Sequence, residues 1–245
     1  MTLRITLAVA GRVLRQLRHD PRTVALLIVV PSLLVALLRY LFDGEPERFD
    51  ALGAPLVGMF PLISMFLVSS ITVLRERTTG TLERLLTLPL AKLDILAGYA
   101  LAFAGFAAVQ AAVVSVVAFA LLGLDVQGSP WAVGGLAVAN AILGMALGLL
   151  VSAFAATEFQ AVQFLPAFVL PQVLLCGLFV PREQMAGALD VAAGALPLTY
   201  AYDSLNRVAT DGALGARGTL DVAVLAGATA LALVLGAATL RRRTS

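Results

Sequence analysis

Long apolar runs separated by short polar stretches dominate this chain. Most of these runs reach the roughly 20 residues that a helix rising 1.5 Å per residue needs to cross about 30 Å of hydrocarbon. The first run carries one charge, Arg39, close enough to its end to reach the headgroup region. The pattern predicts six transmembrane helices, at about 23–42, 52–74, 94–122, 132–156, 159–180 and 221–240.

A seventh apolar stretch, residues 191–202, is too short to span and contains Pro197. At that length a buried, interfacial or re-entrant segment is favoured over a crossing. Composition agrees with a membrane protein, since 60% of the residues are hydrophobic and 13% are charged, against about a quarter charged in soluble domains. We therefore interpret residues 1–245 as one membrane domain of the all-α class.

Positive charge is distributed unevenly about the six spans. Most of the 17 basic residues fall on one side, namely Arg4, Arg12, Arg15, Arg18, Arg22, Arg75, Arg77, Arg84, Lys92, Arg241, Arg242 and Arg243. The positive-inside rule places that side, and with it both termini, in the cytoplasm. A seventh span would move the C-terminal arginines outside, so we reject it. Basic and acidic residues nearly cancel over the whole chain, which leaves a net charge of +2. So small a net charge indicates no nucleic-acid partner.

The N-terminal residues, about 2–20, combine a leucine stripe with arginines largely off that stripe. Such a basic amphipathic helix is expected to lie along the cytoplasmic membrane surface. The plainer interpretation is a basic stub that only sets topology.

Catalytic chemistry finds little support in the sequence. The single histidine, His19, lies in the basic N-terminal segment, so no His-ligated metal site or Ser-His pair can form within the spans. The span centres lack the carboxylates expected of an ion-coupled carrier. The sole lysine, Lys92, follows alanine rather than glycine, so the chain has no phosphate-binding G-x-x-x-x-G-K-[ST] loop. We expect no catalytic site, no metal and no nucleotide bound by this chain.

A few uncharged polar residues lie within the spans. Those we consider for a substrate path are Ser69, Gln110, Asn140 and Gln172. Hydroxyls and amides in a bundle either join helices or line a path, and the sequence does not separate the two roles. The "GMALG" of residues 144–148 fits G-x-x-x-G, which allows helices to approach closely.

Charged residues are concentrated between the predicted second and third spans, in "RERTTGTLERLLTLPLAK", residues 75–92. Gly80 interrupts the second span, Thr81 is a suitable N-cap with Glu83 in the first turn, and Pro89 ends the segment. This predicts a helix of about two turns near 81–88. Leu82, Leu85 and Leu86 share one face of it, which a protein groove would bury favourably.

This stretch closely resembles the R-E-[RK]-x-x-G-T-x-E-x-L-x-x-x-P segment of ABC-2 type permeases, the membrane subunits of ABC exporters that include the daunorubicin-resistance group. Arg75, Glu76, Gly80, Thr81, Glu83, Leu85 and Pro89 match, and Gly98 stands where a glycine often follows. The later "LPLTYAYDSLNRV" is similar to the re-entrant region of the same family.

The resemblance implies the ABC-2, or type V, exporter fold: six spans, an N-terminal surface helix, a cytoplasmic coupling helix and an external re-entrant segment at about 184–207. It further implies that residues near 81–88 dock into an ABC ATPase present in two copies, which binds ATP and Mg²⁺. The ATPase-coupling residues would be Arg75, Glu76, Gly80, Thr81, Leu82, Glu83, Leu85, Leu86 and Pro89.

A second permease, either identical or paralogous, would complete the membrane unit in a prokaryotic plasma (inner) membrane. The expected substrate is lipophilic or amphipathic, such as a drug or a lipid. The alternative is a nucleotide-independent carrier or a structural scaffold, and an intramembrane enzyme ranks third.

Overall fold

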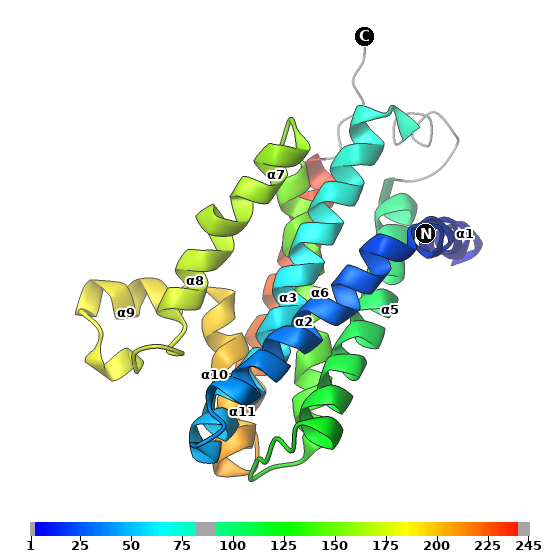
Figure 1. The fold of residues 1–245 in the computed structure, drawn as a ribbon. Helices are drawn as coiled ribbons and strands as arrows, with labels where there is room; N and C mark the ends of the chain where they lie inside the picture. Colours follow the sequence, from blue (N-terminus) through cyan, green and yellow to red (C-terminus); the bar gives the residue numbers. More distant parts are fainter. Residues whose placement is uncertain (1–2, 82–91, 240–245) are drawn as a thin grey trace.

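The fold is a bundle of helices packed around a common core (Figure 1). A computed structural model describes residues 3–81 and 92–239. Within those ranges the regular elements are all helical. The α-helices are α1 (Leu3–Arg18), α2 (Pro21–Leu41), α3 (Pro46–Thr78), α5 (Lys92–Val116), α6 (Pro130–Ser152), α7 (Glu158–Phe164), α8 (Leu170–Leu175), α9 (Gly187–Gly194), α10 (Pro197–Asp211) and α11 (Gly215–Thr239). Short π-helical segments, Val117–Leu121 and Leu165–Val169, continue α5 and join α7 to α8, and a 3-10 turn occupies Arg182–Gln184.

Six helical stretches of the described chain are long and apolar enough to cross a membrane: α2, α3, α5 with its π segment, α6, the stretch from α7 to α8, and α11. This confirms the predicted all-α membrane fold with six spans. The helix α1, the end of α3, the start of α5 and the end of α11 all lie at one end of the bundle (Figure 1). The predicted coupling helix at 81–88 lies outside the described residues except for Thr81.

The helix α3 is longer than the predicted second span. It contains 33 residues, which corresponds to about 50 Å at 1.5 Å per residue. It begins at Pro46, rather than near 52, because proline at the first position and Glu47 in the first turn both favour a helix start. It ends where Gly80 adopts a φ of 70°, a left-handed conformation that glycine accepts readily.

The central packing contact joins α3 to α6. A Cβ atom built on Gly144 would lie 2.1 Å from the Leu62 carbonyl oxygen, and one on Gly148 would lie 2.3 Å from that of Phe66. The Ser69 hydroxyl, which is fully buried, donates across this contact to the Met145 carbonyl oxygen at 3.0 Å. The G-x-x-x-G pattern therefore marks the place where the two helix backbones meet.

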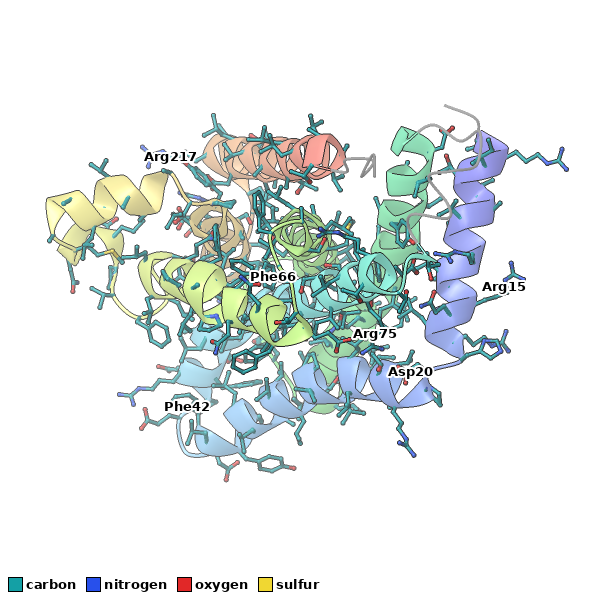
Figure 2. All side chains as sticks on the ribbon, turned by 90° about the horizontal axis from the view of Figure 1, so that it is seen from above. Arg15, Asp20, Phe42, Phe66, Arg75 and Arg217 are labelled. Carbon is teal, nitrogen blue, oxygen red and sulfur yellow. The ribbon has the colours of Figure 1, made fainter. Side chains whose placement is uncertain are left out.

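The surface helix α1 lies across the bundle rather than along it. It is seen almost end-on in Figure 1 and along one edge of the molecule in Figure 2, where Asp20 marks the corner leading into α2. Val9 and Val13 are buried in a cluster shared with α5. A Cβ atom at Gly98 would come within 2.6 Å of the Val9 side chain, so the glycine after the charged stretch allows α1 to pack closely on α5.

Two short helices, α9 and α10, occupy the region expected to be re-entrant, about 184–207. The helix α10 is amphipathic and buries Leu198, Leu205 and Val208 against its neighbours. A left-handed Gly212 separates it from α11. Whether this pair enters the membrane stays a prediction.

The fifth span is not a regular helix. It runs from Glu158 to Leu175 and changes to π-helical geometry around Pro166. Proline cannot donate the backbone hydrogen bond that a regular α-helix requires at this position, and π bulges are a common local solution.

Candidate coupling site and membrane-buried polar residues

The end of α3 carries a buried carboxylate, Glu76, which is only 3% exposed. An arginine of α1 and a tyrosine of α5 meet it there. Arg12 Nη2 lies 2.5 Å from Glu76 Oε2 and 2.7 Å from the Tyr99 hydroxyl oxygen. The Tyr99 hydroxyl also donates to Glu76 Oε2. Three helices are therefore joined by one charged cluster, at the boundary of the 82–91 segment.

The electrostatics of this cluster favour the charged form of Arg12. Burial alone would lower the pKa of the Arg12 guanidinium, but its contacts with Tyr99 and Glu76 outweigh burial and raise that pKa above its ordinary value. Glu76 Oε1 and Arg12 Nε have no hydrogen-bond partner among the described residues. Because a buried pair is costly to break one partner at a time, by about 3–5 kcal/mol, the cluster resists separation of α1 from α3.

The two arginines beside Glu76 reach different helices. Arg75 forms a two-pronged contact with Glu158 at the start of α7, with Nε–Oε1 2.9 Å and Nη2–Oε2 3.2 Å. Arg77 donates to the Ser152 carbonyl oxygen at 2.5 Å, which satisfies an end carbonyl of α6. The last turn of α3 is thus tied to α1, α5, α6 and α7.

The predicted coupling residues divide into two groups. Arg75, Glu76, Gly80 and Thr81 lie at the end of α3 or directly after it, and the Thr81 hydroxyl is 3.1 Å from that of Thr79. Those outside the described residues are Leu82, Glu83, Leu85, Leu86 and Pro89. Contact of either group with an ATPase stays a prediction.

Arg12 and Tyr99 were missed by the sequence analysis, which treated Arg12 as one of several surface arginines. A weak signal existed, because at 100° per residue Arg12 lies between Arg15 and Val9, about 60° from each, at the edge of the face that is buried. Its partners are 64 and 87 positions away, so only the fold identifies them.

The four residues considered for a substrate path occupy different helix interfaces and are all buried. Ser69 joins α3 to α6, and Gln110 donates to the Leu27 carbonyl oxygen of α2 at 2.7 Å. Gln172 donates within its own span to Phe168, at 2.9 Å. Asn140 has no hydrogen bond to any described residue. These contacts give Ser69 and Gln110 a part in helix packing, and a role for any of the four in transport stays a prediction.

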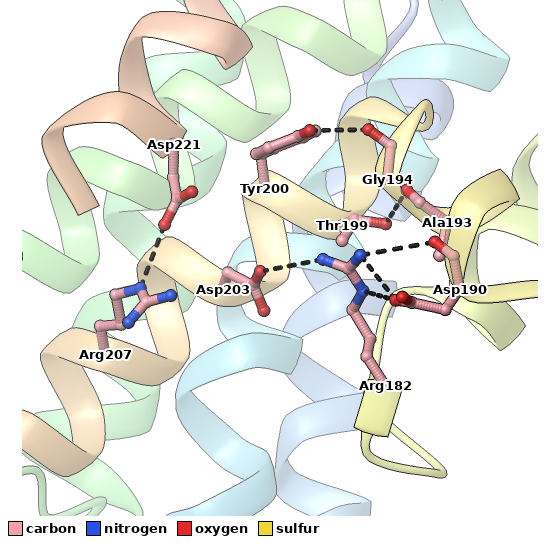
Figure 3. A network of polar contacts seen from close by, with 9 residues as sticks. All are labelled: Arg182, Asp190, Ala193, Gly194, Thr199, Tyr200, Asp203, Arg207 and Asp221. Atoms are coloured by element: carbon pink, nitrogen blue, oxygen red, sulfur yellow. Dashed lines mark hydrogen bonds and ion pairs between the residues drawn. The ribbon is translucent and has the colours of Figure 1, made fainter. Parts of the chain in front are cut away.

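The opposite end of the bundle carries a second charged network (Figure 3). Arg182 lies 2.7 Å from Asp190 of α9 and 4.0 Å from Asp203 of α10, while Arg207 of α10 lies 3.1 Å from Asp221 of α11. Burial, with the negative charge of Asp221 nearby, raises the pKa of Asp203 to about 6. The network links the chain after the fifth span to the start of the sixth.

A hollow of about 360 Å³ at this end is lined by Glu47, Asp50, Asp125 and Gln127, among others. None of the four residues considered for a path lines it. Over residues 3–81 and 92–239, no group of three or more His, Cys, Asp or Glu is placed to hold a metal ion.

Comparison with known proteins decides the family. The profile described as ABC-2 type transporter matches residues 5–208, which is most of the chain. The chain belongs to the ABC-2 type transporter family. The match includes the cluster at the end of α3 and the 75–92 stretch.

Two curated relatives support this ABC-2 assignment. The "Probable multidrug ABC transporter permease YbhR" of Escherichia coli (strain K12) is 35% identical over 136 residues, covering 53% of this chain and 35% of that protein. The "ABC transporter G family member 20" of Dictyostelium discoideum is 23% identical over 171 residues, covering 69% of this chain and 23% of that protein. The aligned region spans only about a third or less of each relative's length.

Membership places this chain among multi-pass membrane permeases, which normally work with an ABC ATPase and are generally not catalytic themselves.

Proposed function

We propose that this ABC-2 chain is the permease subunit of an ATP-driven exporter that moves a lipophilic or amphipathic substrate out of the cytoplasm or the inner leaflet. ATP and Mg²⁺ would be bound by two copies of a separate ABC ATPase. A second permease, identical or paralogous, would complete the membrane unit in a prokaryotic plasma membrane, with both termini in the cytoplasm.

The Arg12–Glu76–Tyr99 cluster is the observation that carries this proposal. Glu76 lies in the last turn of α3, the helix that precedes the 82–91 segment in the chain, and Tyr99 belongs to α5, the helix that follows it. A force applied to that segment by an ATPase would therefore act on α3, α5 and α1 together. The apolar face of Leu82, Leu85 and Leu86, predicted from the sequence, supplies the surface on which the force would act.

The substrate class follows from the spans. Their polar side chains are few and uncharged over most of their length, and ions or strongly polar solutes would need compensating charges there. The name of the Escherichia coli relative, a probable multidrug ABC transporter permease, agrees with a drug as one such substrate.

Co-expression with candidate ABC ATPases from the source genome tests the proposal. We expect the two chains to copurify, and inside-out vesicles containing both to accumulate a lipophilic dye only with hydrolysable ATP. Leu85→Asp should abolish copurification without preventing membrane insertion, and Leu231→Asn, at an exposed apolar position of α11, serves as a polar control. Transport that survives ATP depletion would instead favour a nucleotide-independent carrier.

A further inference from the structure

The surface helix α1 presents more apolar residues than its packing against α5 uses. Val9, Ala10, Val13 and Leu17 are buried. Leu3, Leu7 and Leu14 are 73%, 52% and 43% exposed. At 3.6 residues per turn these three leucines fall within an arc of about 40° beside the buried face, so α1 has a second apolar stripe that no described residue covers.

Arginines border that stripe on its other side. Arg4, Arg15 and Arg18 are exposed and fall within an arc of about 60° next to the leucines. None of the three forms an ion pair with a described residue, whereas Arg12 is ion-paired with Glu76. Figure 2 shows the Arg15 side chain directed away from the bundle.

Acidic side chains do not balance these arginines locally. Asp20 is the only acid among the first 42 residues, and its carboxylate already accepts hydrogen bonds from the backbone and hydroxyl of Thr23, which cap α2. Those hydrogen bonds lower the pKa of Asp20 below its ordinary value, so it stays in its capping role. Arg4, Arg15 and Arg18 therefore have no counterion among the described residues.

We infer that α1 binds anionic phospholipid headgroups through Arg4, Arg15 and Arg18 while its exposed leucines enter the outermost acyl region. Three features favour lipid over other anions: the leucine stripe runs beside the arginines, α1 lies across the bundle, and a short corner at Asp20 joins it to the transmembrane helix α2. That combination fits a helix lying in the membrane interface. The inference takes only the choice of the cytoplasmic leaflet from the proposed function.

A lipid bound here would act close to the coupling site. Arg12 and the lipid-binding arginines belong to one 16-residue helix, so the depth of α1 in the interface also sets where Arg12 meets Glu76. Anionic lipid would then hold α1 in the position that keeps the cluster closed.

Native mass spectrometry of the purified full-length chain tests the binding, with dioleoyl phosphatidylglycerol and dioleoyl phosphatidylcholine as probes. Each basic residue near an anionic surface contributes a factor of about five to binding. We expect the triple variant Arg4→Gln/Arg15→Gln/Arg18→Gln to weaken phosphatidylglycerol binding at least tenfold and to leave phosphatidylcholine binding unchanged. The matched control, Arg39→Gln/Arg48→Gln/Arg217→Gln, removes the same charge at the other end of the bundle and should retain the preference.

A second variant separates charge from misfolding. Arg4→Lys/Arg15→Lys/Arg18→Lys changes the same positions but keeps their charge, and it should bind phosphatidylglycerol nearly as well as the wild type. Inorganic phosphate, compared with chloride at equal ionic strength, should not displace the lipid. The inference is overturned if the glutamine triple keeps the preference, if the lysine triple loses it, or if free phosphate alone removes it. Absence of a preference in the wild type would also overturn it, leaving the arginine face to an acidic protein surface.

None of these measurements depends on transport, so the lipid site and the permease function can fail separately.

Discussion

Removal of Arg12 alone from the Arg12–Glu76–Tyr99 cluster should cost more than removal of the Arg12 and Glu76 charges together. Arg12→Met leaves the Glu76 carboxylate, with a side chain only 4% exposed, without its counterion. A charge stranded in that way typically costs about 3–5 kcal/mol. Glu76→Gln leaves Arg12 instead, and because that side chain is 32% exposed water can compensate part of the loss. For Glu76→Gln we expect about 1–3 kcal/mol, in the range of hydrogen bonds to charged groups.

The double variant Arg12→Met/Glu76→Gln removes both charges and keeps the amide within reach of the Tyr99 hydroxyl. We expect it to be more stable than Arg12→Met alone by at least about 1 kcal/mol. Thermal unfolding in detergent micelles would measure this, since 1 kcal/mol shifts the midpoint by about 2–4 °C for a chain of this size.

Arg75→Gln provides the matched control for that cycle. Its pair with Glu158 is about half exposed on both sides, and such pairs contribute about 0–1 kcal/mol. Additive effects of Arg12→Met and Glu76→Gln, with coupling below about 0.5 kcal/mol, would refute the argument that the cluster ties α1 to α3. An equal loss in Arg75→Gln would refute it as well.

Two further changes test the fold and the second charged network. Gly144→Ala should cost about 3 kcal/mol or more because the new methyl group would meet the Leu62 carbonyl oxygen, whereas Gly105→Ala, with nothing within 4 Å, should be neutral or slightly stabilising in thermal unfolding. The pKa of Asp203 is raised from 3.8 to about 6. Between about pH 4 and pH 6, Asp203 is therefore protonated in the folded protein and ionised in the unfolded chain. Stability should therefore fall as the pH rises from about 4 through 6, by on the order of 2–3 kcal/mol; Asp203→Asn should flatten that part of the profile, and an unchanged profile would contradict the assignment.

Hydropathy and charge were enough to predict the six spans because membrane crossing depends on length and on the absence of charge, both of which are local properties. Helix ends were harder. The early start of α3 at Pro46 depended on a helix-starting proline inside a stretch rich in charge, which a hydropathy argument assigns to a loop. The π segment around Pro166 could not be predicted from the sequence, since the way a helix accommodates a proline depends on the neighbouring backbone.

For residues 75–92, too, the sequence predicted local features but not tertiary contacts. Its residue spacing sufficed to point to the ABC-2 family, which the profile match confirms. It could not show that Glu76 turns inward while Arg75 and Arg77 reach other helices, because the identity of a buried charge's partner is a tertiary property. Arg12 and Tyr99 were recognisable only after α1 was found packed on Gly98.

The unbroken length of α3 has a consequence for motion. Its first turns border the acidic hollow at one end of the bundle, and its last turn holds Glu76 at the other. The helix is continuous between these two ends, although Pro55 and Pro61 lie inside it. A displacement of its last turn would therefore be transmitted past the Gly144 contact toward Glu47 and Asp50, less whatever bending those prolines allow.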